Sequence, residues 1–309
     1  VDGQRIITSR EALELRQVPG RIAIIGGGAT GAEFAYLYNA YGAEVTIIEM
    51  LPYLLPNEDE EISRLLERSF TRQGIKFLTG ARVKAVTKAT DTVRLEVEQE
   101  EGATTLETDH VLVAVGVQAN SDGLGLESLG VIRERGNIMV DASMATNVPG
   151  VYAIGDVTGI LLLAHVAQAQ GVLAVERIAG MDSPALNYEM MPKATYCHPQ
   201  VTSFGLTEKE STERGHEVKV GRFPFQASGK AQAVGDVEGM VKVVADKEYG
   251  ELLGVHMIGR DVTEMLGEMS MARLLEGTTR EVGWLVHSHP TLSEALKEAA
   301  LDADGQAIH

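Results

Sequence analysis

Apolar and polar residues follow regular spacings along the first part of the chain. Residues 21–25 are an apolar, β-branched run that ends in three glycines, and residues 29–41 are rich in Ala, Leu and Tyr. This pattern predicts a strand followed by a helix, and Gly42 is a typical helix end. Residues 44–49 predict a second strand. A strand, a helix and a strand within about 30 residues indicate a parallel sheet.

Residues 59–116 predict one helix followed by several short strands. Apolar residues at helical spacing predict a helix over residues 59–73, which Gly74 ends. Short strands are expected near Phe77 and at residues 83–86, 93–97 and 111–115. Residues 93–106 alternate around a turn at Glu101-Gly102, which predicts an antiparallel excursion from the parallel sheet. We place the end of the first domain at residue 116.

The remainder of the chain predicts two further domains. Residues 117–188 are rich in glycine and then predict a strand at 151–154 and a helix at 164–179. From there to residue 309 the order changes to strands at 217–223, 240–245 and 252–258, and then helices at 262–276 and 293–301. Strands followed by helices, without strict alternation, indicate a separate α+β domain over residues 189–309.

The glycines after the first predicted strand have the spacing of a dinucleotide-binding turn. In Gly26-x-Gly28-x-x-Gly31, the first glycine permits the tight turn, the second admits a pyrophosphate, and the third packs helix on strand. Glu49 follows about 20 positions later, where a carboxylate can accept the hydroxyls of the adenosine ribose. The alternative interpretation is a turn that only reverses the chain.

The charge of Glu49 favours one nicotinamide cofactor. A carboxylate there would repel the 2′-phosphate of NADP, and the next basic residue is Arg64, so the sequence favours NAD. Glu33 lies in the first turn of the predicted helix. From position alone it is equally a cofactor contact or a solvated charge that favours the helix N-terminus.

Composition excludes some classes of partner. The chain has 309 residues, 44% of them hydrophobic, and its net charge of -17 repels nucleic acids and anionic lipid surfaces. The most apolar window, residues 160–175, is interrupted by His165, Gln168 and Gln170, so no membrane span is expected. The single cysteine, Cys197, fits a reducing compartment. We therefore expect a cytoplasmic protein, with a basic protein partner possible and no metal site.

Three further motifs, together with the glycine turn, resemble the flavoprotein disulfide reductases of the pyridine nucleotide-disulfide oxidoreductase family. They are Val-Tyr-Ala-Ile-Gly155-Asp156, Leu162-Leu163-Ala164-His165, and His287-Ser-His289-Pro-Thr-Leu-Ser-Glu294. The last is most similar to the motif of dihydrolipoyl dehydrogenases. The resemblance implies an α/β fold with three parts: a Rossmann-like NAD-binding domain (1–116), a central segment that contacts FAD (117–188), and an α+β interface, or dimerisation, domain (189–309).

The resemblance also implies the residues that contact the two cofactors. NAD would lie against Gly26, Gly27, Gly28, Ala29, Thr30, Gly31, Ala32, Glu33, Glu49, Val83 and Gly116. FAD would lie against Asp156, Leu162, Leu163, Ala164 and His165.

His289 resembles the catalytic base of this family, and Glu294 resembles the carboxylate that orients it. A dithiol must lose a proton before it attacks a disulfide, and an imidazole can accept that proton near neutral pH. A carboxylate on the other ring nitrogen fixes the tautomer. In the family this histidine serves the flavin of the other subunit, which implies a homodimer. His287 is assigned no chemistry.

The sequence departs from the family in two places. The usual Gly-Arg-x-Pro-Asn motif is Gly116-Val-Gln-Ala-Asn120, without the arginine and the proline. The family's N-terminal FAD-binding unit and its Cys-x-x-x-x-Cys redox pair do not occur in these residues. Cys197 is expected to be a buried small hydrophobe. We therefore expect this chain to be part of a larger enzyme and to be inactive alone with disulfide substrates.

These observations lead to one functional hypothesis and two alternatives. The hypothesis is a dihydrolipoyl dehydrogenase that uses FAD and NAD and serves the lipoyl-bearing subunits of a 2-oxoacid dehydrogenase or glycine-cleavage complex. One alternative is another disulfide reductase, such as a mercuric or glutathione reductase. The other is a non-catalytic NAD-binding or assembly module.

Overall fold

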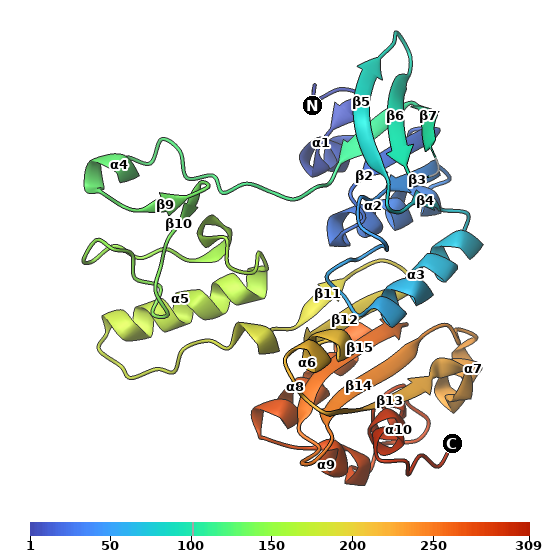
Figure 1. Cartoon of the computed structure of the whole chain (residues 1–309), viewed down its shortest axis with the longest axis vertical. Coiled ribbons are helices and arrows are strands. Elements are labelled where there is room, and N and C mark those ends of the chain that lie inside the picture. The colour runs from blue at the N-terminus through green and yellow to red at the C-terminus, as the bar shows by residue number, and fades with distance from the viewer. Residues whose placement is uncertain (101) are drawn as a thin grey trace. The chain divides into compact units, whose positions relative to one another are not determined.

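The computed structural model describes residues 1–100 and 102–309, and the chain divides into two compact units (Figure 1). The first unit joins Val1–Val115 to Pro192–His309, and the second is Gly116–Met191. The fold is mixed α/β, with one parallel and one antiparallel five-stranded sheet in the first unit. The predicted fold class is confirmed.

The N-terminal half of the first unit contains a parallel sheet with strand order β1-β8-β2-β3-β4. The strands are β1 (Ile6–Ile7), β2 (Arg21–Ile25), β3 (Glu44–Ile48), β4 (Lys76–Leu78) and β8 (His110–Val113). The helices are α1 (Ser9–Glu14), α2 (Ala29–Ala40) and α3 (Glu60–Arg72). The order reverses at β2, and the carboxyl ends of strands at such a point are where α/β sheets bind ligands.

The predicted antiparallel excursion is confirmed. Strands β5 (Arg82–Lys88), β6 (Val93–Gln99) and β7 (Gly102–Thr108) form a three-stranded antiparallel sheet. Val93, Leu95 and Val97 are fully buried between exposed neighbours and pack against the parallel sheet. Of the predicted turn, Glu101 lies outside the described residues.

The C-terminal half of the first unit is an antiparallel sheet with strand order β11-β12-β15-β14-β13 (Figure 1). Its strands are β11 (Lys193–Thr195), β12 (Gln200–Gly205), β13 (Val218–Pro224), β14 (Met240–Asp246) and β15 (Leu252–Gly259). The helices are α6 (Glu208–Glu213), α7 (Gly229–Val234), α8 (Val262–Leu274), α9 (Thr279–Trp284) and α10 (Glu294–Ala303), with a 3-10 turn η3 (Phe225–Ala227). Helix α8 packs on β15, and α10 packs on β13 and β14. Strands β14 and β15 are therefore buried almost throughout.

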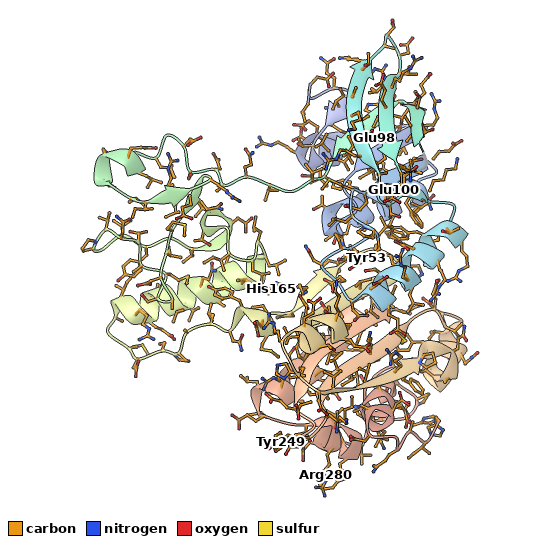
Figure 2. The ribbon with its side chains drawn as sticks, viewed as in Figure 1. Tyr53, Glu98, Glu100, His165, Tyr249 and Arg280 are labelled. Carbon is orange, nitrogen blue, oxygen red and sulfur yellow. The ribbon has the colours of Figure 1, made fainter. Side chains whose placement is uncertain are left out.

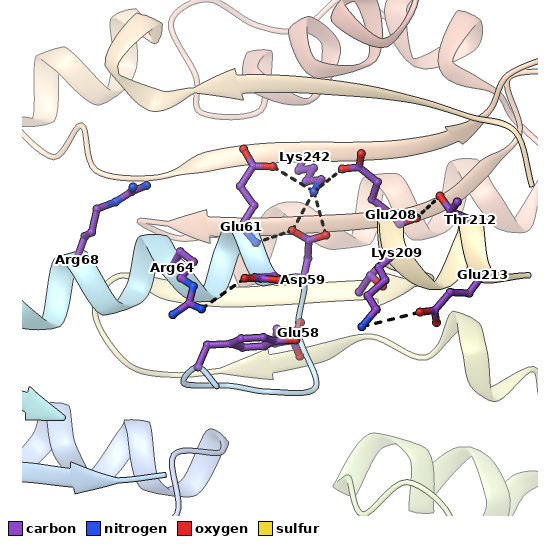
Figure 3. A pocket seen from close by; sticks show the side chains of 13 residues that line it. Glu58, Asp59, Glu61, Arg64, Arg68, Glu208, Lys209, Thr212, Glu213 and Lys242 are labelled. Atoms are coloured by element: carbon purple, nitrogen blue, oxygen red, sulfur yellow. Dashed lines mark hydrogen bonds and ion pairs between the residues drawn. The ribbon is translucent and has the colours of Figure 1, made fainter. Parts of the chain in front are cut away.

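A buried lysine connects the two halves of the first unit (Figure 3). Lys242 of β14 is 4% exposed, and its Nζ lies 3.0 Å from both carboxylate oxygens of Asp59, the N-cap of α3. The same nitrogen lies 3.1 Å from Glu61 and 2.9 Å from Glu208. Burial alone would lower the pKa of Lys242, but these carboxylates outweigh it, so the pKa is raised above its usual value. The lysine is therefore charged and fully paired.

The second unit is smaller and has little regular sheet. Its elements are α4 (Leu126–Leu129), β9 (Arg133–Glu134), β10 (Asn137–Ile138), η1 (Gly155–Thr158), α5 (Ala164–Ile178) and η2 (Tyr188–Met190). The strand predicted at residues 151–154 is wrong for this structure, because the segment makes only an isolated bridge between Tyr152 and Ala145. A β-branched run becomes a strand only where a neighbouring strand accepts its backbone hydrogen bonds.

Within the described residues, no helix combines the length and the apolar character that crossing a bilayer would require.

Candidate functional site

Two glycines of the turn after β2 are required by the protein's own packing. Gly26 has a φ of +108°, and a Cβ there would lie 2.4 Å from the carbonyl oxygen of Ala114, just beyond β8. A Cβ on Gly31 would lie 1.9 Å from the carbonyl oxygen of Gly26. Both distances are far below van der Waals contact, so the roles predicted for these glycines, a tight turn and close packing of α2, are confirmed.

Gly28 is different, because nothing in the protein requires a glycine there. Its backbone is extended, with φ -72° and ψ -173°, and a Cβ would meet no atom within 4 Å. Gly28 is also the N-cap of α2 and has no side chain to cap the first N–H groups. Ala29 and Thr30 in the first turn are exposed. The open space and the uncapped helix end fit a bound pyrophosphate.

Glu49 lies immediately after β3 and points at the glycine turn. The side chain is 7% exposed, and its Oε2 accepts a 2.6 Å hydrogen bond from the Gly27 N–H. Its Oε1 accepts a 2.7 Å bond from the Leu51 N–H. Two charge-assisted bonds hold the carboxylate beside the turn, and an ionised carboxylate has further acceptor sites for a ribose hydroxyl. The Gly27 N–H is already used by Glu49.

The other residues predicted to contact NAD have varied surroundings. Glu33 is half-buried, and its Oε1 accepts a 2.8 Å bond from the Tyr196 N–H, a contact that neither interpretation of Glu33 anticipated. Val83 of β5 is partly buried against the cluster of Val93, Leu95 and Val97, whereas Ala32 is fully buried in a different hydrophobic cluster. Gly116 has a φ of +114° and open space around it, and it belongs to the second unit.

In the second unit, the residues predicted to contact FAD surround one turn. Asp156 in η1 is exposed, and Leu162, Leu163, Ala164 and His165 lead into the first turn of α5, where Figure 2 labels His165. Gln170 of α5 is fully buried, and its Oε1 accepts a 2.7 Å bond from the Gly155 N–H. Gln170 therefore holds the Gly155-Asp156 turn against α5. Sequence reasoning missed it, because a glutamine inside a helix carries no signal of its partner.

His289 and Glu294 are brought together as predicted. His289 Nδ1 lies 2.9 Å from Glu294 Oε1, and Glu294 Oε2 accepts a 2.8 Å bond from the Thr291 N–H. Burial opposes ionisation of Glu294, but these two hydrogen bonds hold its pKa below the usual value. The His289 side chain is 77% exposed, so Nε2 is open to a reactant.

His287, two residues earlier, also has a carboxylate partner. Its side chain is 6% exposed, and Nε2 lies 2.7 Å from Glu268 Oε1 on α8. Sequence reasoning missed Glu268, which is distant from the motif in the sequence.

Cys197 is 3% exposed, and burial raises the pKa of its thiol to about 12. The prediction that it is a buried small residue is confirmed. Within the described residues, no cluster of three or more His, Cys, Asp or Glu side chains could hold a metal ion.

Comparison with known proteins shows what the chain resembles. Residues 1–171 match the model of the pyridine nucleotide-disulphide oxidoreductase family, and residues 191–300 match its dimerisation domain. The chain is 46% identical over 311 residues to a dihydrolipoyl dehydrogenase of Bacillus subtilis, covering 100% of this chain and 66% of that protein. It is 48% identical over 306 residues to one of Mycobacterium leprae, covering 98% of this chain and 66% of that protein.

Solved structures agree with these matches. The crystal structure of LpdA from Mycobacterium tuberculosis superposes with a TM-score of 0.88 and 28% identity, over 97% of this chain and 65% of that one. The Cu(II) complex of the flavoprotein disulfide reductase RclA from Escherichia coli superposes with a TM-score of 0.89 and 26% identity, over 96% and 67%. The chain therefore spans slightly less than two thirds of the length of the two dehydrogenases above.

Proposed function

The chain belongs to the pyridine nucleotide-disulphide oxidoreductase family, and on this premise we propose that it forms the NAD-binding, central and dimerisation parts of a dihydrolipoyl dehydrogenase. The reaction would oxidise dihydrolipoamide to lipoamide and reduce NAD⁺ to NADH, with release of one proton. The observation that carries the proposal is the His289–Glu294 pair, since it leaves Nε2 exposed to accept a thiol proton.

When bound, FAD and NAD would supply the electron transfer, and the residues of this chain would bind them and control the proton. The open space at Gly28 and the uncapped N-terminus of α2 would receive the pyrophosphate of NAD. Glu49 would accept the adenosine ribose hydroxyls. Asp156 and the start of α5 would provide part of the FAD contacts. The N-cap of α5, Leu163, makes no side-chain cap.

In the proposed mechanism, His289 acts as the proton acceptor. Glu294, ionised at neutral pH, would keep the proton of the neutral ring on Nδ1 and the lone pair on Nε2. Nε2 would then take the proton of a dithiol, and the imidazolium would be stabilised by the carboxylate. The only cysteine of this chain, Cys197, is buried, so the redox pair of the reaction would lie outside these residues.

We also infer a homodimer that serves lipoyl-bearing subunits of a 2-oxoacid dehydrogenase or glycine-cleavage complex in the cytoplasm. Large apolar side chains are exposed on α8 and α9 and just after each of them, and such patches mark protein contacts. They are Met271, Leu274, Leu275, Trp284, Leu285 and Val286. They all belong to the segment that matches the family's dimerisation domain.

The proposal is tested by substrate choice. NADH formation by the full-length protein, loaded with FAD, is measured with dihydrolipoamide and NAD⁺, and NAD(P)H-dependent reduction is measured with glutathione disulfide and with Hg(II). Turnover with dihydrolipoamide and NAD⁺, but with neither glutathione disulfide nor Hg(II), supports the proposal. Preference for either other substrate indicates another reductase, and binding of NAD⁺ without any turnover indicates a non-catalytic module.

The two glycines that flank the start of α2 are expected to respond differently to alanine. Gly28→Ala should leave the free energy of unfolding within about 1 kcal/mol of wild type, because its Cβ enters open space, but should weaken NAD⁺ binding at least roughly tenfold. Gly31→Ala should reduce the free energy of unfolding by about 1–3 kcal/mol, because its Cβ overlaps a carbonyl oxygen. Urea unfolding measures the free energy of unfolding, and calorimetric titration measures the affinity for NAD⁺. Equal effects of the two variants on both quantities would contradict the different roles assigned to Gly28 and Gly31.

Glu49 is expected to select NAD⁺ over NADP⁺ by at least roughly 100-fold in Kd, since apposed like charges cost several kcal/mol. Glu49→Gln removes the charge and should narrow that ratio while also weakening NAD⁺ binding. Calorimetric titration of wild type and of Glu49→Gln with both cofactors measures the ratio. A wild-type protein that binds the two cofactors equally would refute the role of Glu49.

A further inference from the structure

The connection between α9 and α10 carries the proposed proton acceptor, yet it is poorly supported by its own side chains. Within the single subunit, every residue from 284 to 290 is exposed except His287, and Trp284, Leu285 and Val286 belong to the apolar patch assigned above to the homodimer contact. The His287 side chain is 6% exposed, whereas that of His289 is 77% exposed. Within its own subunit, His287 is therefore the one side chain of this run that is directed inward.

The partner of His287 lies on a well-supported helix. Its Nε2 lies 2.7 Å from Oε1 of Glu268, and the backbone of α8 that carries Glu268 packs against β12 and β15. A hydrogen bond between a ring nitrogen and a carboxylate is directional and charge-assisted. Glu268 thus fixes the connection to the antiparallel sheet from the α8 side.

The other side of the connection is held by α10. Glu294 binds both His289 Nδ1 and the Thr291 N–H, and Thr291 Oγ1 donates a 2.8 Å bond to the Ser288 carbonyl. His289 therefore lies between two anchors, one on each helix. Both histidine rings line the same hollow of about 330 Å³.

Packing alone does not explain a histidine at position 287. Its Nδ1 is buried and finds no hydrogen-bond partner among the described residues, which is unfavourable for a polar atom. An apolar side chain of similar size would fill the space without that cost. The contribution of the ring must therefore come from its other nitrogen, which binds Glu268.

We propose that His287 and Glu268 form a positioning pair that holds the connection so that His289 Nε2 faces the reacting dithiol. This inference rests on the proposed function of His289. His287 itself does not touch the substrate.

The first test measures turnover of the full-length, FAD-loaded enzyme with dihydrolipoamide and NAD⁺. His287→Leu is expected to lower kcat roughly 10- to 100-fold, because a misplacement of about 1 Å can cost about 100-fold. His287→Gln should recover most of the loss, since its amide nitrogen can reach the position of Nε2. Val282→Ala, a truncation of a buried side chain on α9, is the control and should keep kcat within about twofold.

A double-mutant cycle tests whether the two residues act as one pair. Glu268→Leu should lower kcat about as much as His287→Leu, and the double variant should be no slower than either single variant. Multiplied losses in the double variant would overturn the pairing. If His287→Leu does not fold, Glu268→Leu alone keeps the inference testable, because a kcat equal to that of wild type would overturn the pairing.

A spectroscopic readout separates this inference from the proposed function. The ¹⁵N shifts of the His289 ring, recorded about two pH units above the ordinary histidine pKa of about 6.5, report which nitrogen carries the proton. Wild type should show the proton on Nδ1, and His287→Leu should show a mixture of tautomers. A mixture of His289 tautomers in His287→Leu would support the positioning pair. If wild type at the same time shows no turnover with dihydrolipoamide, the proposed function is rejected while the positioning pair stands. Unchanged shifts and unchanged kcat in His287→Leu would reject the positioning pair.

Discussion

Replacing His289 by glutamine in the full-length enzyme is expected to lower turnover with dihydrolipoamide by roughly 100- to 10,000-fold, the range over which a general base contributes. The glutamine amide can still donate a hydrogen bond, but it cannot accept the thiol proton at neutral pH. The loss should appear in kcat, because proton transfer is the step that the ring is proposed to serve. Steady-state NADH formation measures it.

The ionisation of Glu294 determines the pH range in which the His289–Glu294 pair is intact. Because the pKa of Glu294 in the folded protein lies below the ordinary value of 4.5, its carboxylate is ionised at neutral pH and can stabilise a protonated His289. The stability that this carboxylate contributes is complete above the ordinary glutamate pKa. It is lost as the pH falls through the lowered value in the folded protein.

The matched control for this substitution is His216→Gln, which changes an exposed histidine in the turn after α6. This control should keep normal turnover and normal flavin absorbance. Turnover of His289→Gln within a few-fold of wild type would remove His289 from the mechanism.

Lys242→Met is expected to lower the free energy of unfolding by about 3–5 kcal/mol, because breaking a buried ion pair leaves uncompensated charge. In this case the stranded groups are the carboxylates of Asp59, Glu61 and Glu208 (Figure 3). Asp59 is 3% exposed and cannot turn to solvent without disturbing the N-terminus of α3. Arg222, which also pairs with Glu61 and Glu208, would offset only part of the loss.

Lys209→Met is the control, because Lys209 is 79% exposed and pairs along its own helix with Glu213. Surface pairs of this kind contribute about 0.3–0.5 kcal/mol. Urea unfolding followed by circular dichroism and by the fluorescence of the single tryptophan, Trp284, measures both variants. If Lys242→Met is as stable as Lys209→Met, the buried network does not hold α3 to the antiparallel sheet.

The elements that could be predicted from sequence are those whose signal is local. The strand, turn and helix from residue 21 to 40 are specified by adjacent apolar residues and by glycines whose backbone angles or packing exclude other side chains. The short elements β11, β12, α6, α7 and α9 were missed, since each is only three to six residues long and depends on neighbours distant in sequence. The same dependence made the strand predicted at 151–154 wrong.

The site divides in the same way. His289 and Glu294 lie in one motif that resembles the family's, so the resemblance implied their pairing. Glu268 is 19 residues from His287, and Asp59 is 183 residues from Lys242, and no pattern in the sequence connects either pair. Gln170 is 15 residues from Gly155, in a helix whose spacing predicts its existence but not which side chain turns inward to bind.

By itself, the sequence determined the dinucleotide turn, the acidic residue that follows it, the histidine motif and the longer strands and helices, because backbone preference and side-chain spacing act over a few residues. Only the tertiary structure decided which polar groups are buried and which partners they find. Those choices depend on exclusion of water by segments that are far apart in the chain. A buried charge or imidazole is stable only with a partner that the folded structure brings to it.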